Sequence, residues 1–141
     1  MHIPHIIKKG HCTMKDMFCF QCQQTAHNTG CEGKAGVCGK KADTANYQDE
    51  IIGALIGLAR AAKNGRPTES TDALVEKALF TTITNVNFDP QTVDQLTESI
   101  HAACPGIGFD YDMANLWHEP DEDIRSLREL ITYGLKGLSA Y

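Results

Sequence analysis

Four cysteines within twenty residues constrain the fold of this chain more than any other feature of its sequence. Their spacing is Cys-x2-Cys-x8-Cys-x6-Cys, set by Cys19, Cys22, Cys31 and Cys38. A Cys-x2-Cys pair lets two thiolates of one tight turn face the same ion or cluster, and two further cysteines complete four sulfur ligands. Residues 17–42 are therefore predicted to form a cofactor-binding loop. His27 lies inside this loop and could be a ligand, but with four cysteines available we expect it to face solvent or to lie beside the ligands without binding the metal.

The residues between the cysteines favour an iron–sulfur cluster over zinc. Glycines let the backbone wrap closely and aim N–H groups at sulfur, and they recur at Gly30, Gly33, Gly36 and Gly39. Positive charge is added nearby by Lys34, Lys40 and Lys41. Compact zinc ribbons usually pair two Cys-x2-Cys knuckles, whereas the second pair here is separated by six residues. From the spacing alone, zinc stays open as an alternative, and so do disulfides or free thiols.

The N-terminal residues give no sign of secretion or membrane insertion. The apolar stretch Ile3-Pro4-His5-Ile6-Ile7 is too short for the core of a signal peptide, and no segment approaches the roughly 18 consecutive apolar residues of a membrane helix. We therefore expect a cytoplasmic location, where reduced thiols favour metal binding over disulfides. The formal net charge of −5 argues against nucleic acid or a membrane surface as the main partner.

Residues 1–16 are not predicted to belong to the fold. Met14 and Met17 both offer internal start sites, and the Lys8-Lys9-Gly10 run would be encoded by purine-rich codons like those of a ribosome-binding site. Translation is therefore expected to begin at Met14 or Met17, and a disordered extension is the alternative. In either case Cys12 lies outside the predicted fold.

From Asp43 onward, apolar residues recur with the periodicity of helices. After a cap near Asp43 and Thr44, a first apolar face comprises Ile51, Ile52, Leu55, Ile56, Ala59 and Ala62. After the capping candidates Ser70 and Thr71, a second comprises Leu74, Val75, Ala78, Leu79, Thr82, Ile83 and Val86. Asp89-Pro90 supplies an N-cap and a first-turn proline for a third face, which comprises Val93, Leu96, Ile100 and Ala103.

A last helix is expected after a run of acidic residues that suits the helix dipole, Asp121, Glu122 and Asp123. Its apolar stripe comprises Ile124, Leu127, Ile131, Leu135 and Leu138. Residues 105–120 are interpreted as an irregular loop, and no alternating strand pattern is found. Residues 43–141 are therefore predicted to form a helical bundle. The fold class is all-α, with the glycine-rich four-cysteine loop in front of the bundle.

The stretch MFCFQCQQTAHNTGC, followed by GVCGK, closely resembles the N-terminus of the hybrid cluster protein family, also called prismane proteins or hydroxylamine reductases. Three later segments look like successive helices of that family's N-terminal helical domain. They are TANYQDEIIGALIGLA (44–59), ALFTTITNVNFD (78–89) and SLRELITYGLKGLSAY (126–141). The resemblance thus covers Met17 to Tyr141.

The resemblance implies that the four cysteines bind a [4Fe–4S] cluster. Their last gap holds six residues, whereas the anaerobe-type members of the family resemble Cys-x2-Cys-x8-Cys-x5-Cys. A second branch, with a longer middle gap and a six-residue last gap, is associated with a [2Fe–2S] centre. The middle gap and the surrounding residues here favour [4Fe–4S].

Members of the family are several times longer than this chain. The resemblance implies that the hybrid iron–sulfur–oxygen cluster, where hydroxylamine is reduced to ammonia and water, is ligated much further along; nitric oxide is a competing substrate. The chain is expected to be an incomplete N-terminal domain that relays electrons, with no catalytic residue and no turnover of its own. Its expected partners are a redox donor protein and the missing C-terminal part of the enzyme. A stand-alone electron carrier and a zinc-stabilised interaction domain are the alternatives.

Overall fold

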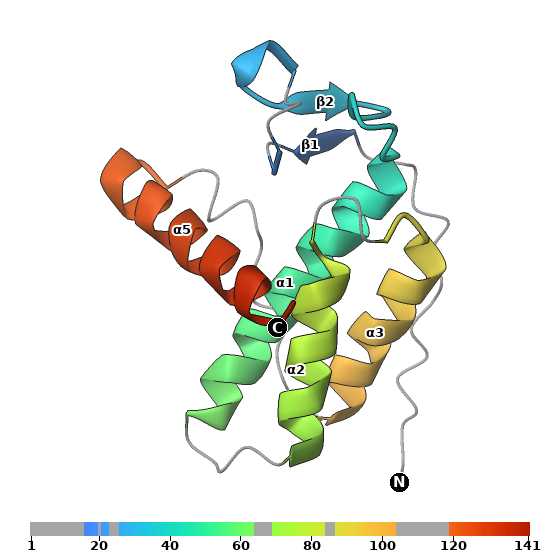
Figure 1. Ribbon diagram of the computed structural model, residues 1–141, viewed down its shortest axis with the longest axis vertical. Coiled ribbons are helices and arrows are strands. Elements are labelled where there is room, and N and C mark those ends of the chain that lie inside the picture. Colours follow the sequence, from blue (N-terminus) through green and yellow to red (C-terminus); the bar gives the residue numbers. More distant parts are fainter. Residues whose placement is uncertain (1–15, 20, 23–25, 64–68, 84–86, 104–118) are drawn as a thin grey trace, which may run out of the picture.

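The computed structural model describes residues 16–19, 21–22, 26–63, 69–83, 87–103 and 119–141. Over these residues the fold is mostly helical, with a two-stranded sheet at one end (Figure 1), which confirms the predicted all-α class. The helices are α1 (Ala42–Ala62), α2 (Glu69–Thr81), α3 (Pro90–Ala103) and α5 (Glu122–Leu138). The predicted leader, apart from Asp16, and most of the predicted 105–120 loop lie outside the described residues.

Helices α1, α2 and α3 pack together and form the main core. Their buried residues are Ile51, Ile52, Ala54, Leu55, Leu58, Ala78, Val93, Leu96 and Ile100. Apart from Ala54 and Leu58, all of these lie on the apolar faces predicted from periodicity. Ala59 and Ala103, also placed on those faces, are exposed near the helix ends. None of the described helices is long and apolar enough to cross a membrane.

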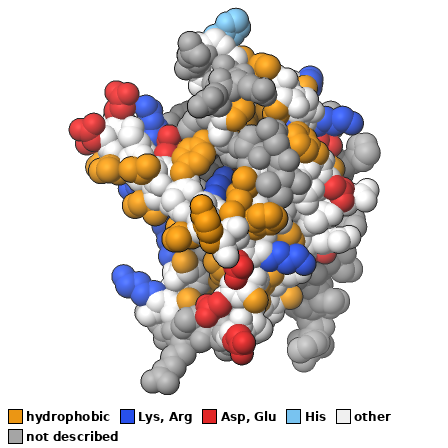
Figure 2. Space-filling view, viewed as in Figure 1, with side chains coloured by type: hydrophobic (Ala, Val, Ile, Leu, Met, Phe, Trp, Pro, Cys, Tyr) orange, Lys and Arg blue, Asp and Glu red, His pale blue; other side chains and the backbone are white. Residues whose placement is uncertain are grey.

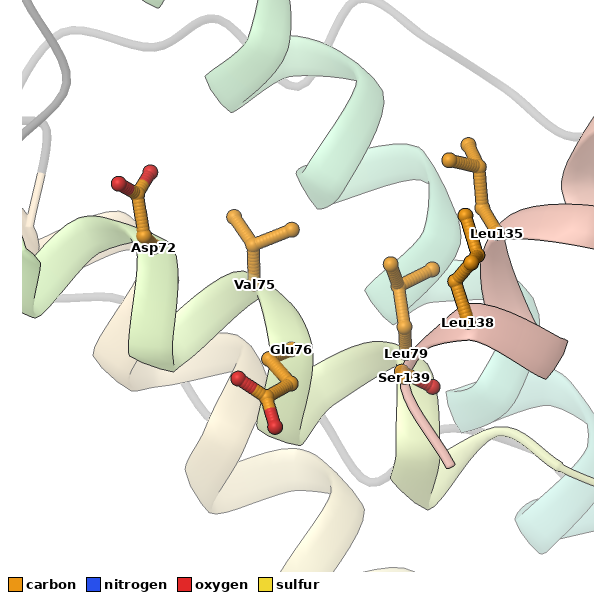
Figure 3. A pocket seen from close by; sticks show the side chains of 7 residues that line it. All are labelled: Asp72, Val75, Glu76, Leu79, Leu135, Leu138 and Ser139. Carbon is orange, nitrogen blue, oxygen red and sulfur yellow. The ribbon is translucent and has the colours of Figure 1, made fainter. Parts of the chain in front are cut away.

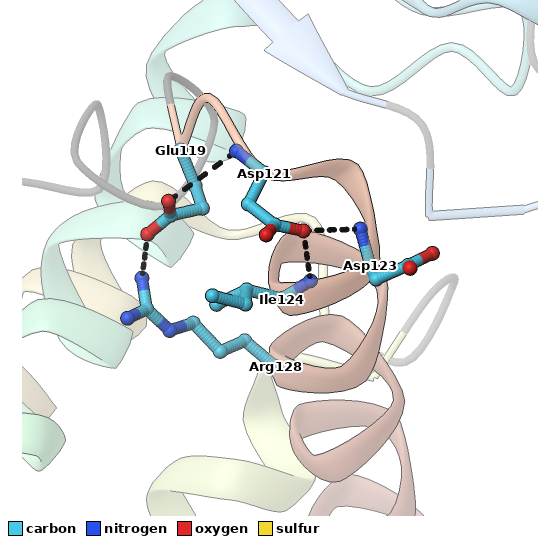
Figure 4. A network of polar contacts seen from close by, with 5 residues as sticks. All are labelled: Glu119, Asp121, Asp123, Ile124 and Arg128. Carbon is cyan, nitrogen blue, oxygen red and sulfur yellow. Dashed lines mark hydrogen bonds and ion pairs between the residues drawn. The ribbon is translucent and has the colours of Figure 1, made fainter.

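Aspartates cap two of the helices; the cap at Asp89 is predicted by the sequence, whereas Asp121 is predicted only as part of an acidic run at the start of the last helix. The Asp89 carboxylate accepts a hydrogen bond from the Gln91 backbone N–H at 3.1 Å, at the start of α3. The Asp121 carboxylate accepts from the backbone N–H groups of Asp123 at 3.0 Å and Ile124 at 3.2 Å, at the start of α5 (Figure 4). Each cap satisfies N–H groups that the first helical turn leaves without a partner.

The cap predicted for α1 near Asp43 and Thr44 is wrong. The helix begins at Ala42, and Lys41 occupies the N-cap position without a side-chain cap bond. The preceding loop provides the reason, because the Ala42 backbone N–H already donates to the Lys34 carbonyl at 3.0 Å. A backbone carbonyl of the loop thus pairs with an N–H group in the first turn of α1, the task that a capping side chain performs in α3 and α5.

The cysteine loop contains two short strands that the sequence pattern does not predict. β1 (Met17–Cys19) and β2 (Cys31–Gly33) pair antiparallel, with Met17 opposite Gly33 and Cys19 opposite Cys31. Three residues are too few for an alternating pattern to be recognised. The hairpin packs on the start of α1 through a small second core of Met17, Cys31, Ala42 and Ala45.

Helix α5 differs most from the predicted bundle. Its apolar stripe is exposed instead of buried, with Leu127 at 60% and Leu138 at 72% of full exposure. Figure 2 shows hydrophobic side chains gathered along this helix. Near the start of this helix, Arg128 forms an ion pair of 2.7 Å with Glu119, which precedes the helix (Figure 4). Among the described elements, α5 contacts chiefly α2, and the contact near its C-terminal end includes Leu135 and Leu138.

Candidate metal centre

The hairpin places two of the four candidate ligands on facing strands. Cys19 ends β1 and Cys31 begins β2, and the register sets them directly opposite each other. Cys31 is buried, Cys19 is half-buried, and both are free thiols. Opposite residues of an antiparallel pair project to the same face of the ladder, so the two sulfur atoms share one side of the hairpin.

A tight turn brings the segment with Cys38 back toward the hairpin. The Gly39 N–H donates to the Gly36 carbonyl at 2.9 Å, and the Gly36 N–H donates to the Lys40 carbonyl at 2.8 Å. Gly39 has φ +86°, which favours glycine at this point of the turn. A Cβ atom on Gly36 would lie 3.7 Å from the Cys31 Sγ, so the turn runs close against that thiol.

Cys22 follows β1 as a half-buried free thiol. Tyr133 of α5 interacts electrostatically with the thiols of both Cys19 and Cys22. Burial, and then the neighbouring Cys19, Glu129 and Cys22 groups, raise the pKa of Tyr133 to about 12. Helix α5 therefore lies near the thiols of Cys19 and Cys22.

The donor chemistry of the site fits an iron–sulfur cluster. Four free thiols are present in one loop, and four cysteine thiolates are the usual ligand set of [2Fe–2S] and [4Fe–4S] clusters. Among the described residues, no three His, Cys, Asp or Glu side chains stand close enough together to hold a single metal ion. His27 is exposed, as expected, in the short η1 helix (Ala26–Asn28) with φ 55°.

The sequence model of the Prismane/CO dehydrogenase family matches residues 17–141. The chain belongs to this family. Similar proteins include hydroxylamine reductases from Bacteroides thetaiotaomicron, 38% identical over 151 residues, and from Caldanaerobacter subterraneus, 41% identical over 159 residues. A third, from Methanocaldococcus jannaschii, is 42% identical over 154 residues. Each of these matches covers 89% of this chain.

These prismane-family relatives are much longer than the chain. The matched region is 28% of the Bacteroides thetaiotaomicron and Methanocaldococcus jannaschii proteins and 29% of the Caldanaerobacter subterraneus protein. The name hydroxylamine reductase therefore refers to proteins more than three times as long as the region they share with this chain.

Two buried lysines and an aspartate lie near Cys19. Lys40 and Lys136 are exposed by 1% and 6%. Burial raises the pKa of the Cys19 thiol, whereas a hydrogen bond from the Gln21 backbone and the Lys40 ammonium act to lower it; the Asp49 carboxylate raises it. The charged groups that act on the Cys19 thiol are therefore the Lys40 ammonium of the loop and the Asp49 carboxylate of α1.

Three residues around Lys40 and Cys19 are not predicted by the sequence as parts of the site, among them Gln48, which accepts a hydrogen bond from Lys40. Gln48 and Asp49 lie on α1, and Lys136 lies on α5, where its ammonium donates to the Thr82 carbonyl at 3.5 Å. Lys136 nevertheless has a sequence signal, because it is the one charged residue in 130–141. A cation alone in an apolar stretch of helix is a candidate for burial against polar partners.

Asp49→Asn is expected to flatten the dependence of stability on pH. Burial, opposed by Lys136 and Lys40, raises the pKa of Asp49 from 3.8 to about 7. Between these values the native chain binds more protons than the unfolded chain, so the free energy of unfolding falls as the pH rises. We expect the wild-type chain to lose about 1–2 kcal/mol between about pH 5 and about pH 7, and the variant to lose much less.

Urea unfolding at several pH values measures this effect. Burial lowers the pKa of Lys136 to about 8, so this residue stays protonated across most of the window. The matched control is Asp94→Asn on α3, a helix that carries neither buried lysine. An Asp49→Asn variant with the same pH dependence as wild type would contradict the account.

An open apolar groove lies apart from the cysteines. It runs between α2 and the end of α5 (Figure 3), and it is lined by Asp72, Val75, Glu76, Leu79, Leu135, Leu138 and Ser139. None of these side chains is a thiol, an imidazole or a buried acid. The groove therefore offers packing surface.

Proposed function

We propose that this chain is the iron–sulfur portion of a hydroxylamine reductase-like protein. Cys19, Cys22, Cys31 and Cys38 hold one [4Fe–4S] cluster, which passes electrons toward the reduction of hydroxylamine or nitric oxide. The observation that carries this proposal is the set of four free cysteines in a chain that belongs to the prismane family and is similar to hydroxylamine reductases. No residue of this chain is proposed as catalytic.

The cluster, when bound, supplies one-electron transfer. The proposal is supported by the hairpin register, which sets Cys19 opposite Cys31, and by the glycine turn, which carries Cys38 and runs close against the Cys31 thiol. An apolar side chain covers part of the site. Met17 is exposed by 3% and is buried together with Cys31 in the small second core, against which Cys19 packs. Such cover limits the access of water, one of the factors that set a cluster's reduction potential.

The proposed role is that of a relay and not of a complete enzyme. A redox donor protein in the cytoplasm supplies the electrons, and the reaction itself takes place in a region that the longer relatives have and this chain does not span. The proposal therefore predicts transfer of electrons without reduction of hydroxylamine.

The test begins with the chain reconstituted anaerobically with iron and sulfide, then reduced with dithionite. Mixed with oxidised cytochrome c, the reduced chain is expected to return to its oxidised spectrum while the cytochrome is reduced. Mixed with hydroxylamine, it is expected to form ammonium no faster than the protein-free buffer. Ammonium formation well above the buffer rate would contradict the relay role, and a chain that exchanges no electrons with cytochrome would contradict the redox role.

A further inference from the structure

Lys40 is among the most deeply buried large side chains of the described residues, with 1% exposure. It directly follows the glycine turn that carries Cys38, and that turn directs it inward. The next residue, Lys41, is exposed. Two adjacent lysines of the same loop therefore lie in opposite environments, which requires an explanation because burying an ammonium costs free energy.

A neutral partner holds the buried ammonium. Lys40 Nζ donates to Gln48 Oε1 at 2.7 Å, and Gln48 Nε2 donates to the Asn87 carbonyl at 3.3 Å. Gln48 is itself exposed by 1%. The amide fixes the position of the ammonium through α1 and the segment before α3. Because the amide carries no net charge, it does not neutralise the lysine.

The charged groups around Lys40 add up to a positive charge near the Cys19 thiol. Lys136 of α5 adds a second buried cation, and Asp49 of α1 is the carboxylate that interacts with both lysines. Two buried ammonium groups thus face one carboxylate, so the balance of these three groups is positive even when Asp49 is ionised. The Lys40 ammonium acts on Cys19 to lower the pKa of its thiol, which is the direction that stabilises a thiolate.

We propose that Lys40, fixed beside Cys19 by Gln48, is a positioning residue whose buried charge raises the reduction potential of the cluster in the four-cysteine site. The inference rests on the proposed function, because it needs that cluster. A reduced cluster carries one more negative charge than an oxidised one, so a nearby fixed cation stabilises the reduced form. Burial preserves the effect, since solvent and salt screen a buried charge much less than an exposed one.

The test compares the reduction potentials of the cluster in the Lys40→Met and Lys41→Met variants. Both variants are loaded with cluster without oxygen, and electron paramagnetic resonance measures how much of the cluster is reduced. Methionine keeps most of the length of the side chain and removes the charge. At a fixed potential near the wild-type midpoint, the ratio of reduced to oxidised cluster is expected to fall about tenfold in Lys40→Met, or about 59 mV for a one-electron couple. Lys41→Met is expected to change it less than about twofold, as an exposed charge is screened.

Lys40→Arg keeps the charge and is expected to restore most of the potential. The Gln48→Glu variant is a second test that leaves Lys40 in place. Glutamate has the same shape as glutamine, and its carboxylate neutralises the charge of the Lys40 ammonium. It is expected to shift the potential in the same direction as Lys40→Met. If Lys40→Met fails to fold or to load its cluster, the potential of Gln48→Glu decides alone, and an unchanged value overturns the inference.

Equal potentials in Lys40→Met and Lys41→Met would also overturn it, and would leave Lys40 with a purely structural role. That outcome is distinct from failure of the proposed function. In the latter case the wild-type chain itself would show no cluster signal after anaerobic reconstitution.

Discussion

Cys31→Ala is expected to lower the iron content of the anaerobically purified chain by about tenfold or more. Even the loss of an outer partner of a metal ligand typically costs about 10–100-fold in metal affinity, and Cys31 is proposed as a ligand itself. It is also the buried member of the four, opposite Cys19 in the hairpin and beside the turn with Cys38. Its removal therefore opens the centre of the proposed site. Iron and acid-labile sulfide per chain measure the effect.

Cys12→Ala is the matched control, because it removes a thiol of the same chemistry that lies outside the predicted fold. We expect its iron content to equal that of the wild-type chain. Far-ultraviolet circular dichroism of both variants shows whether the helices persist. A Cys31→Ala chain that keeps full iron while Cys12→Ala loses it would refute the ligand assignment.

Ile51→Ala is expected to destabilise the chain by about 2–5 kcal/mol. Ile51 is fully buried on α1 and belongs to the core with Val93 and Ile100 of α3. Alanine removes three carbon atoms there and leaves a cavity that rigid helices fill only in part. Because small domains are stable by only about 5–15 kcal/mol, this loss is a large fraction of the total.

The control applies the same substitution to a solvent-exposed site. Ile131 lies on α5 and is exposed by 63%, so Ile131→Ala is expected to change stability by less than about 0.5 kcal/mol. The midpoint of urea unfolding, followed by circular dichroism, measures both variants. Similar midpoints for the two would mean that α1 and α3 do not form the core described above.

The sequence was sufficient to predict the helices and the cap at Asp89. Asp89 and Asp121 act locally, since a side chain and the N–H groups it caps lie within three residues of each other. The core faces of α1 and α3 follow from periodicity, which any amphipathic helix must show when one side is buried. These features depend on neighbouring residues in the sequence, and pattern reasoning reaches them.

Features that depend on distant residues were not predicted. The cap of α1 was replaced by the Lys34 carbonyl, which the loop brings to Ala42. The burial of Lys40 and Lys136 follows from partners on other elements, Gln48 and the Thr82 carbonyl. An apolar stripe predicts that a helix face will be buried but does not identify its neighbour. The exposed stripe of α5 shows the limit of that inference.

For the four cysteines, sequence and structure contribute different parts of the argument. Spacing selected the residues, the residues between them favoured an iron–sulfur cluster over zinc, and the resemblance implied the [4Fe–4S] type. The structure adds the pairing of Cys19 with Cys31 and the buried charges beside them. The assignment of all four as ligands stays a prediction that metal analysis can test directly.

The most direct test is the metal content of the wild-type chain purified without oxygen, measured together with acid-labile sulfide and Mössbauer spectra. The account predicts a brown protein with about four iron and four sulfide per chain and the spectrum of a [4Fe–4S] cluster. About two iron per chain would contradict the cluster type. A colourless protein with one zinc per chain and no sulfide would contradict the central claim.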